Sequence, residues 1–252
     1  GKTEPNAKVV VTLPNGEKVP VTADKEGNFS ITPKAPVEAN KPISAVATDE
    51  AGNPSLPKQT IREVNPPATA PVVKILLDNT PDDGFINKAE KGTKTTTDLQ
   101  VSIPTDAKAG DVISVTDAAN KELGKFIVGQ NGVTAGSTQV IKNVTLPAEG
   151  QSLSVKTSIT NAGGTTNGNT DTAKVDTLVP EISRLEVNPQ GTLITGKTEP
   201  NAKVVVTLPN GDKVPVTADK DGNFSITPKA PVEANKPISA VATDEAGNPS
   251  LP

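Results

Sequence analysis

Several residue types that carry enzyme chemistry are missing from this chain of 252 residues. It contains no histidine and no cysteine, which excludes a serine–histidine–aspartate triad, a cysteine nucleophile, a zinc ion held by either side chain, and any disulfide. Paired carboxylates remain possible as an acid–base pair, but no pattern in the sequence builds a pocket around them. We therefore expect a protein that is not an enzyme.

Large apolar side chains are also scarce. The chain has four phenylalanines and no tryptophan, tyrosine or methionine, while 33% of its residues are hydrophobic. Burial of apolar surface contributes roughly 25 cal/mol per Å², so thin cores of valine, isoleucine, leucine and alanine stabilise small domains only weakly. Such domains need further stabilisation from neighbouring domains or from bound ions.

Arginine and long apolar runs are limited as well. The net charge is −4 and the only arginines are Arg62 and Arg184, which argues against a nucleic-acid partner. No run of 18 apolar residues is present, so we expect no membrane insertion. With neither an initiating methionine nor a signal peptide, the chain is expected to be an internal piece of a longer protein.

What the chain does contain is a long internal repeat. Residues 1–57 recur as residues 196–252, and only two of these 57 positions differ. The differing pairs are Glu17 with Asp212 and Glu26 with Asp221. A repeat of this length indicates an array of modules.

Composition and repeat together predict an all-β protein built of tandem immunoglobulin-like β-sandwich modules in an elongated array. The 24 prolines and 20 glycines supply turns, and short valine-rich runs between them are typical of strands. We expect residues 1–66 to form a repeat that lacks its first strand and residues 67–177 to form a middle module. Residues 178–252 are expected to form a repeat that lacks its last strand.

Alternation of apolar and polar residues indicates where the strands lie. Residues 182–187 alternate at period two, and Asn210-Gly211 between two such runs is a strong hairpin signal. Further strands in the last module are expected near residues 192–195, 203–208, 213–217, 223–227 and 238–243. In the middle module they are expected near residues 72–77, 98–103, 112–116, 124–128, 139–144, 153–160 and 173–176.

A loop in the middle module resembles a calcium-binding loop. Residues 79–90 place Asp83, Gly84, Asn87 and Glu90 at positions 5, 6, 9 and 12 of the EF-hand pattern. Calcium takes six to eight oxygen ligands, and a glycine at position 6 permits the sharp turn. This spacing predicts a Ca²⁺ site that uses Asp83, Asn87 and Glu90.

The same loop departs from the EF-hand pattern in two places. Position 1 is Asn79, and position 3 is Pro81, which has no side-chain oxygen. No flanking helices are expected. The alternative interpretation is a polar loop in which Asp83-Gly84 only forms a turn and Glu90 is solvated.

A second group of carboxylates follows from the topology of a sandwich. In such a fold two loops of the last module return to the pole where the linker arrives, which brings Asp176, Glu199 and Asp244 together. A calcium ion that clamps this joint would offset their mutual repulsion. Glu4 and Asp49 are the equivalents in the first copy. The alternative is that these three acids are simply solvated at the surface. The linker into the middle module lacks aspartate, so the joint between the first and middle modules is expected to be ion-free.

Several segments resemble repeats of large bacterial surface adhesins. Residues 195–202, 221–225 and 242–248 are similar to bacterial Ig-like repeats, and residues 83–90 and 175–177 are similar to partner repeats of biofilm-associated-protein-like and RTX-type adhesins. The resemblance implies a calcium-stiffened extracellular stalk at the bacterial cell surface that takes part in adhesion and biofilm formation. It also implies secretion by a type I system.

Two positions depart from the pattern of these adhesins. Leu178 and Val179 stand where the family's linker has threonine and alanine. Asn161 stands where a loop of the middle module usually has aspartate, which weakens any calcium site at the leading pole of that module.

Three functions are open at this point. The first is a mechanical spacer whose partners are the neighbouring repeats of the same chain. In the second the modules bind a host surface or a matching repeat, although scarce aromatic residues argue against sugar binding. In the third they are accessory modules of a secreted hydrolase.

Overall fold

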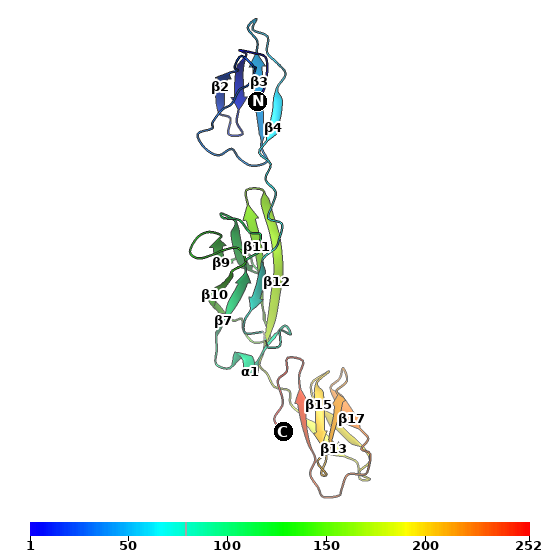
Figure 1. The fold of residues 1–252 in the computed structure, drawn as a ribbon. Coiled ribbons are helices and arrows are strands. Elements are labelled where there is room, and N and C mark those ends of the chain that lie inside the picture. The colour runs from blue at the N-terminus through cyan, green and yellow to red at the C-terminus, as the bar shows by residue number, and fades with distance from the viewer. Residues whose placement is uncertain (79) are drawn as a thin grey trace.

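Three β modules follow one another along an elongated molecule in the computed structural model, which describes residues 1–78 and 80–252 (Figure 1). Each module is separated from the next by a short linker, and the two termini lie in the outer modules. The described part of the chain holds one helix, α1 (Lys88–Lys91), at the end of the middle module that faces the last module. The expected all-β class and tandem sandwich architecture are confirmed.

The last module is a sandwich of two three-stranded sheets. One sheet has the order β13-β14-β17 and the other β16-β15-β18. The strands are β13 (Arg184–Val187), β14 (Ile194–Lys197), β15 (Lys203–Thr207), β16 (Lys213–Thr217), β17 (Asn223–Ile226) and β18 (Ser239–Thr243). The valine-rich strand β15 alternates as predicted, with Val204 and Val206 buried, and Phe224 fills the core between the sheets.

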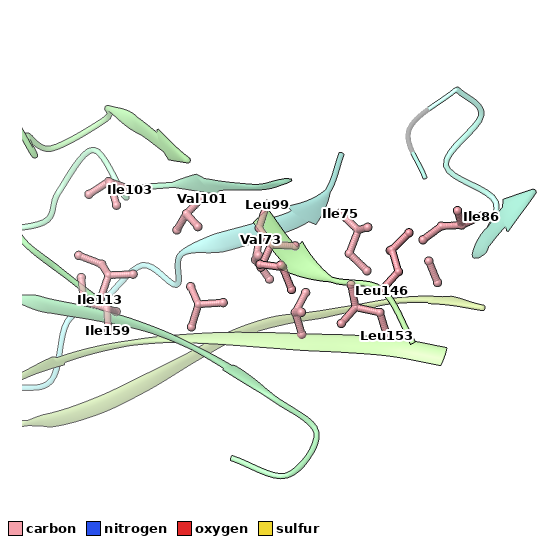
Figure 2. Packing of buried hydrophobic residues seen from close by; sticks show 14 of the residues in the cluster. Val73, Ile75, Ile86, Leu99, Val101, Ile103, Ile113, Leu146, Leu153 and Ile159 are labelled. Atoms are coloured by element: carbon pink, nitrogen blue, oxygen red, sulfur yellow. The ribbon is translucent and has the colours of Figure 1, made fainter. Parts of the chain in front are cut away.

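The middle module is larger, and its two sheets have the orders β10-β7-β5 and β6-β12-β11-β8-β9. The strands are β5 (Val72–Ile75), β6 (Phe85–Asn87), β7 (Thr96–Ser102), β8 (Val112–Asp117), β9 (Glu122–Ile127), β10 (Thr138–Thr145), β11 (Ser152–Asn161) and β12 (Gly164–Asp176). Aliphatic side chains from both sheets meet between them, among them Val73, Leu99 and Ile113 (Figure 2). No aromatic ring is fully buried in this core, as the composition predicts.

Most middle-module strands lie where the sequence predicts them, but three features differ. Strand β12 begins near residue 164 rather than 173, because residues 164–172 pair with β11 although they are rich in threonine and asparagine. Strand β6 was not expected, and it forms because Phe85–Asn87 pairs in parallel with the end of β12. Helix α1 follows it directly, so the expectation of no helix beside this loop is wrong.

The first module keeps only one regular sheet. Its order is β2-β1-β3-β4, with strands β1 (Lys8–Thr12), β2 (Lys18–Thr22), β3 (Pro42–Thr48) and β4 (Lys58–Ile61). The sequence predicts the loss of the first strand alone. Within residues 1–66, all of which the structure describes, the counterparts of β14 and β17 are also not regular strands. Strand β17 pairs with β14, and of that partner the first copy has only Gly1 and Lys2, which leave a single bridge from Lys2 to Asn28.

Candidate metal centres at the module joints

The joint between the middle and last modules is held by one side chain, Asn248. Its amide Nδ2 donates at 2.8 Å to the main-chain carbonyl of Asp176, which ends β12 where the linker begins. Its Oδ1 accepts from the main-chain N–H of Lys88 at 2.7 Å. The same amide donates to Asp244 Oδ2 at 2.9 Å. Asn248 is 1% exposed. A single asparagine therefore connects a loop of the last module to both the linker and α1 of the middle module.

The near-identical first copy shows which features of Asn248 depend on its contact with the middle module. Asn53, the counterpart of Asn248, keeps the local bonds to Asp49 at 2.7 and 2.9 Å. However, Asn53 and its neighbour Ala51 are exposed, whereas Asn248 and Ala246 are each 1% exposed. Because the local sequence is the same, the burial at the second joint comes from the docked middle module.

A second contact fixes the linker to the middle module. Thr177 donates from its main-chain N–H and its hydroxyl to the two carboxylate oxygens of Glu149, at 2.9 and 2.6 Å. Partial burial by itself would raise the pKa of Glu149, but the Thr177 bonds, together with the charges of Lys91 and Lys174, lower it. The sequence analysis did not single out Glu149, whose role depends on a contact 28 residues away.

The three carboxylates predicted at this joint lie near one another. Partial burial, with the negative charges of Asp244 and Asp176, raises the pKa of Glu199, so the charges interact. Nevertheless, over residues 1–78 and 80–252, no three carboxylates converge closely enough to hold a metal ion as they are placed. Both Asp244 oxygens accept hydrogen bonds from Asn248. Lys174 pairs with Asp176 at 3.5 Å. The joint therefore combines hard oxygen donors and only partly compensated negative charge, without a preformed metal site.

The counterparts in the first module, Glu4 and Asp49, have no module before them in this chain. Glu4 is exposed. Hydrogen bonds from Asn53 lower the pKa of Asp49, so its carboxylate is satisfied within its own loop.

The EF-hand-like loop of the middle module folds around a carboxylate that the sequence pattern did not include. Asp78 is 2% exposed and accepts from the main-chain N–H groups of Asp83 and Gly84 at 3.1 and 3.0 Å. The pKa of Asp78 is raised from 3.8 to about 6, and burial is the main cause. Position 1 of the predicted pattern, Asn79, lies outside the described residues. The buried acid beside it was missed because the pattern was counted from the next residue.

The predicted ligands Asn87 and Glu90 instead cap helix α1. Asn87 Oδ1 accepts from the N–H groups of Ala89 and Glu90, and Glu90 Oε2 accepts from the N–H of Asn87 at 3.0 Å. This reciprocal pair is a capping box. The other oxygen, Glu90 Oε1, is buried and has no hydrogen-bond partner among the described residues. Burial, with the nearby charge of Asp83, raises the pKa of Glu90.

The two candidate sites, predicted separately, lie at the same end of the middle module. Strand β6 pairs with β12 so that Asn87 is opposite Asp176 in the register, and the N–H of Lys88 bonds Asn248 of the last module. A Cβ atom placed on Gly247 would lie 3.6 Å from Asn87 Nδ2. The loop and the joint carboxylates are therefore neighbours across one interface.

The joint between the first and middle modules is held mainly by amide and hydroxyl groups, with one carboxylate, Asp106, which accepts from the hydroxyl of Thr69 at 2.8 Å. Asn161, the last residue of β11, donates from its amide to the carbonyl of Asn65 at 3.0 Å. Thr166 donates from its hydroxyl to the carbonyl of Pro67. Asn40 of the first module both donates to and accepts from the main chain of Val64, at 2.8 and 2.9 Å. The linker is thus hydrogen-bonded from both sides.

Gly163 allows this turn to approach the linker, and its replacement tests the joint. A Cβ at Gly163 would lie 2.4 Å from the carbonyl oxygen of Val64, so Gly163→Ala forces the linker to shift. We expect a loss of about 1 kcal/mol in the stability of the first joint and a broader distribution of angles between the first two modules. Calorimetry and small-angle scattering measure these effects. Gly150 has a φ of 77° and open space around it, so Gly150→Ala strains the backbone without touching the linker and controls for the strain of replacing a glycine. Equal scattering from both variants would contradict the expectation.

Comparison with known proteins agrees with this geometry. A family model described as the bacterial Ig domain matches residues 1–63 and 180–252, more than half of the chain. No curated protein matches. None of the helices in the described residues is both long and apolar enough to cross a membrane.

Solved structures similar to the chain include parts of an adhesin, of a biofilm-associated protein and of titin. A 1.5-MDa bacterial ice-binding adhesin, from work on host cell surface retention, is 20% identical over 99% of this chain and 84% of that chain, with a TM-score of 0.32. The BSP domain of a biofilm-associated protein is 18% identical over 70% of this chain and 26% of that chain, with a TM-score of 0.27. A segment of titin is 12% identical over 98% and 87%, with a TM-score of 0.35.

The fold and the joints define a tandem array of immunoglobulin-like β modules. The chain belongs to the bacterial Ig domain family.

Proposed function

We propose that the chain is a structural spacer in an extracellular bacterial surface adhesin, and that Ca²⁺ stiffens its second joint. The observation that carries the proposal is the second joint itself, where one buried asparagine bridges two modules and the charges of Asp244 and Asp176 act on Glu199. Repeated modules joined in this way add length to the molecule and carry force along it, and none of them needs a catalytic pocket. Adhesion and biofilm formation then belong to the longer protein that carries the spacer.

The donors at the joint fit calcium by their chemistry. Asp176, Glu199 and Asp244 offer hard oxygen ligands, which Ca²⁺ prefers. The raised pKa of Glu199 reflects partial burial and the negative charges of Asp244 and Asp176, although Lys174 pairs with Asp176 at 3.5 Å. As placed these three carboxylates do not converge, so their side chains would rotate to hold the ion. A bound cation would remove the repulsion between these carboxylates and would connect the linker to two loops of the last module.

The loop of the middle module offers a second set of donors. Glu90 Oε1 is a buried oxygen without a hydrogen-bond donor, and Asp78 and Asp83 add further carboxylates to the same loop. Asp78, Asp83 and Glu90 would hold an ion here, with the Asn87 amide oxygen beside them. Such an ion would stiffen the end of the middle module on which the last module docks.

Calcium titration of the whole chain tests the proposal. We expect the maximum dimension from small-angle scattering to become better defined, and the last module to melt at higher temperature, as Ca²⁺ is added to metal-free protein. The double variant Asp176→Asn, Glu199→Gln should lose most of this response, because two of three anionic ligands are gone.

The first copy provides a matched control. Glu4→Gln with Asp49→Asn changes equivalent residues that have no preceding module in this chain, so the calcium response should be kept. If metal-free and calcium-loaded protein were equally straight and equally resistant to heat, the stiffening role would be wrong. If the control pair abolished the response as fully as the joint pair, the ion would be bound elsewhere.

A further inference from the structure

The first and last long strands of the middle module, β5 and β12, run side by side in the same direction. Strand β5 follows the first linker, and β12 leads into the second. Val73 in β5 is hydrogen-bonded to Asn169 in β12. Two residues further along each strand, Ile75 is bonded to Asp171. A pull on the two ends of the module therefore drives β5 and β12 past each other along their length.

Side chains of β12 join these two strands, which belong to different sheets. The amide of Asn169 pairs with Val73 as a neighbouring strand would. Its Oδ1 accepts from the main-chain N–H at 2.7 Å, and its Nδ2 donates to the carbonyl at 2.9 Å. Asp171 Oδ2 accepts from the N–H of Ile75 at 2.7 Å. Because Val73 and Ile75 are core residues, these bonds tie the core of one sheet to the last strand of the other.

The same alignment extends into the first linker. Besides the bond from Asn161 to Asn65, the hydroxyl of Thr166 donates to the carbonyl of Pro67. A Cβ atom on Gly168 would collide with the carbonyl oxygen of Pro71, so the two main chains come very close there. The linker therefore lies against the middle module before β5 begins.

Strand β6 continues the alignment at the other end of the module. Phe85–Asn87 pairs in parallel with Lys174–Asp176 at the end of β12. Figure 2 shows Val73, Ile75 and Ile86 following one another in that order along the core. The contacts between the leading segment and β12 thus lie across the direction of a pull along the chain.

We propose that the seam between residues 65–75 and residues 161–171 sets the mechanical strength of the middle module, and that Asn169 and Asp171 fasten it. The inference rests on the proposed function, because a spacer under tension is pulled along its length. In shear the bonds of the seam must break together, whereas bonds that are peeled apart break one after another. Forced unfolding is governed by the unfolding rate, so bonds that resist the pull together slow it most.

Force spectroscopy on the whole chain tests the seam. The chain contains no cysteine, so one cysteine added at each end attaches the handles uniquely. Residues 67–177 release up to about 400 Å of extended chain, more than either outer module, which identifies their unfolding step. In metal-free buffer at constant force, Asn169→Ala should make this step about tenfold faster, because two bonds to Val73 are lost.

Thr172→Ala is a matched control on the same strand. The hydroxyl of Thr172 donates to that of Ser154 in β11 at 2.8 Å, so this variant also loses a side-chain bond of β12, but one outside the seam. Its unfolding rate under force should stay close to that of the wild type. Asp171→Asn keeps an oxygen that accepts from Ile75 and should behave likewise, whereas Asp171→Ala should unfold faster. Equal rates for Asn169→Ala and Thr172→Ala would overturn the proposal.

The direction of the pull tests the seam without weakening it. Ala68 and Ala162 are exposed and lie at the end of the middle module that faces the first module. Handles on cysteines at these two positions peel β5 from β12 instead of sliding the strands past each other. The middle module should then unfold at least about tenfold faster at the same force, because its bonds break in turn. Equal rates in the two directions would overturn the proposal.

The calcium response separates this inference from the proposed function. The force measurements use metal-free protein, whereas the stiffening of the second joint is measured by adding Ca²⁺. A chain without a calcium response that keeps the differences between Asn169→Ala and Thr172→Ala would contradict the stiffening and support the seam. A chain that stiffens with calcium but unfolds equally fast in both variants would contradict the seam alone.

Discussion

Replacing Asn248 with alanine is expected to destabilise the last module by about 2 kcal/mol, whereas the same change at Asn53 costs about 0.5 kcal/mol. The alanine leaves the carbonyl of Asp176 and the N–H of Lys88 without their partner at a buried interface. A buried polar group that loses its partner keeps the full cost of desolvation. At Asn53 the side chain is exposed, and water replaces the lost bonds.

The two copies can be measured separately within one sample. Hydrogen exchange followed by mass spectrometry distinguishes peptides that contain residue 17 from those that contain residue 212, because glutamate and aspartate differ in mass. Asn248→Ala should speed exchange in the last module and around Lys88, and Asn53→Ala should leave the middle module unchanged. Scattering should also show a wider range of angles at the second joint. Equal destabilisation by the two variants would mean that Asn248 acts only within its own loop.

Within each module, local sequence patterns predicted most of the architecture. The Asn210-Gly211 pair marks the hairpin between β15 and β16, and β16 (Lys213–Thr217) has the bounds that were predicted. Period-two alternation depends only on neighbouring residues, so it can be recognised without knowing how the rest of the chain folds. Strand β6 needs the end of β12 as its partner, almost 90 residues further along the chain, and no local pattern in the sequence indicates this strand.

The joint could be predicted only in outline. Topology predicted that Asp176, Glu199 and Asp244 meet at this joint, and the charges of Asp244 and Asp176 do act on the pKa of Glu199, but Asn248 was not identified as the residue that connects the modules. Asn53 and Asn248 have the same local sequence, so nothing nearby in the chain distinguishes the exposed one from the buried one. Their difference arises from contacts 72 and 160 residues apart.

The loop of the middle module illustrates a limit of motif matching. Spacing alone selected Asp83, Asn87 and Glu90, whereas the structure shows that Asn87 and Glu90 also form the cap of α1. The deeply buried acid of the loop is Asp78, one residue before the matched pattern begins. The burial of Asp78 depends on how the loop packs on the module, and a motif of residue types at fixed spacing carries no information about that packing.

Asp78 should make the stability of the metal-free middle module fall as pH rises through about 6. Its pKa is raised from 3.8 to about 6, so the folded state binds the proton more tightly than the unfolded state does. The resulting stabilisation is complete below about pH 3.8 and is lost as pH rises through the folded value. A shift of this size corresponds to about 3 kcal/mol.

Calorimetry in calcium-depleted buffers at pH 4.5 and 7.5 measures this effect for the wild-type chain and for Asp78→Asn. The asparagine side chain stays neutral, so the fall in stability between the two pH values should be smaller for the variant by about 2 kcal/mol, because pH 4.5 already lies above the unfolded pKa. Identical pH dependence in both proteins would show that Asp78 does not control it. Added Ca²⁺ separates the roles of this carboxylate, because an ion held by Asp78 and its neighbours would favour the charged form. With calcium present, the wild-type module should therefore keep its stability at pH 7.5, while the variant should gain little.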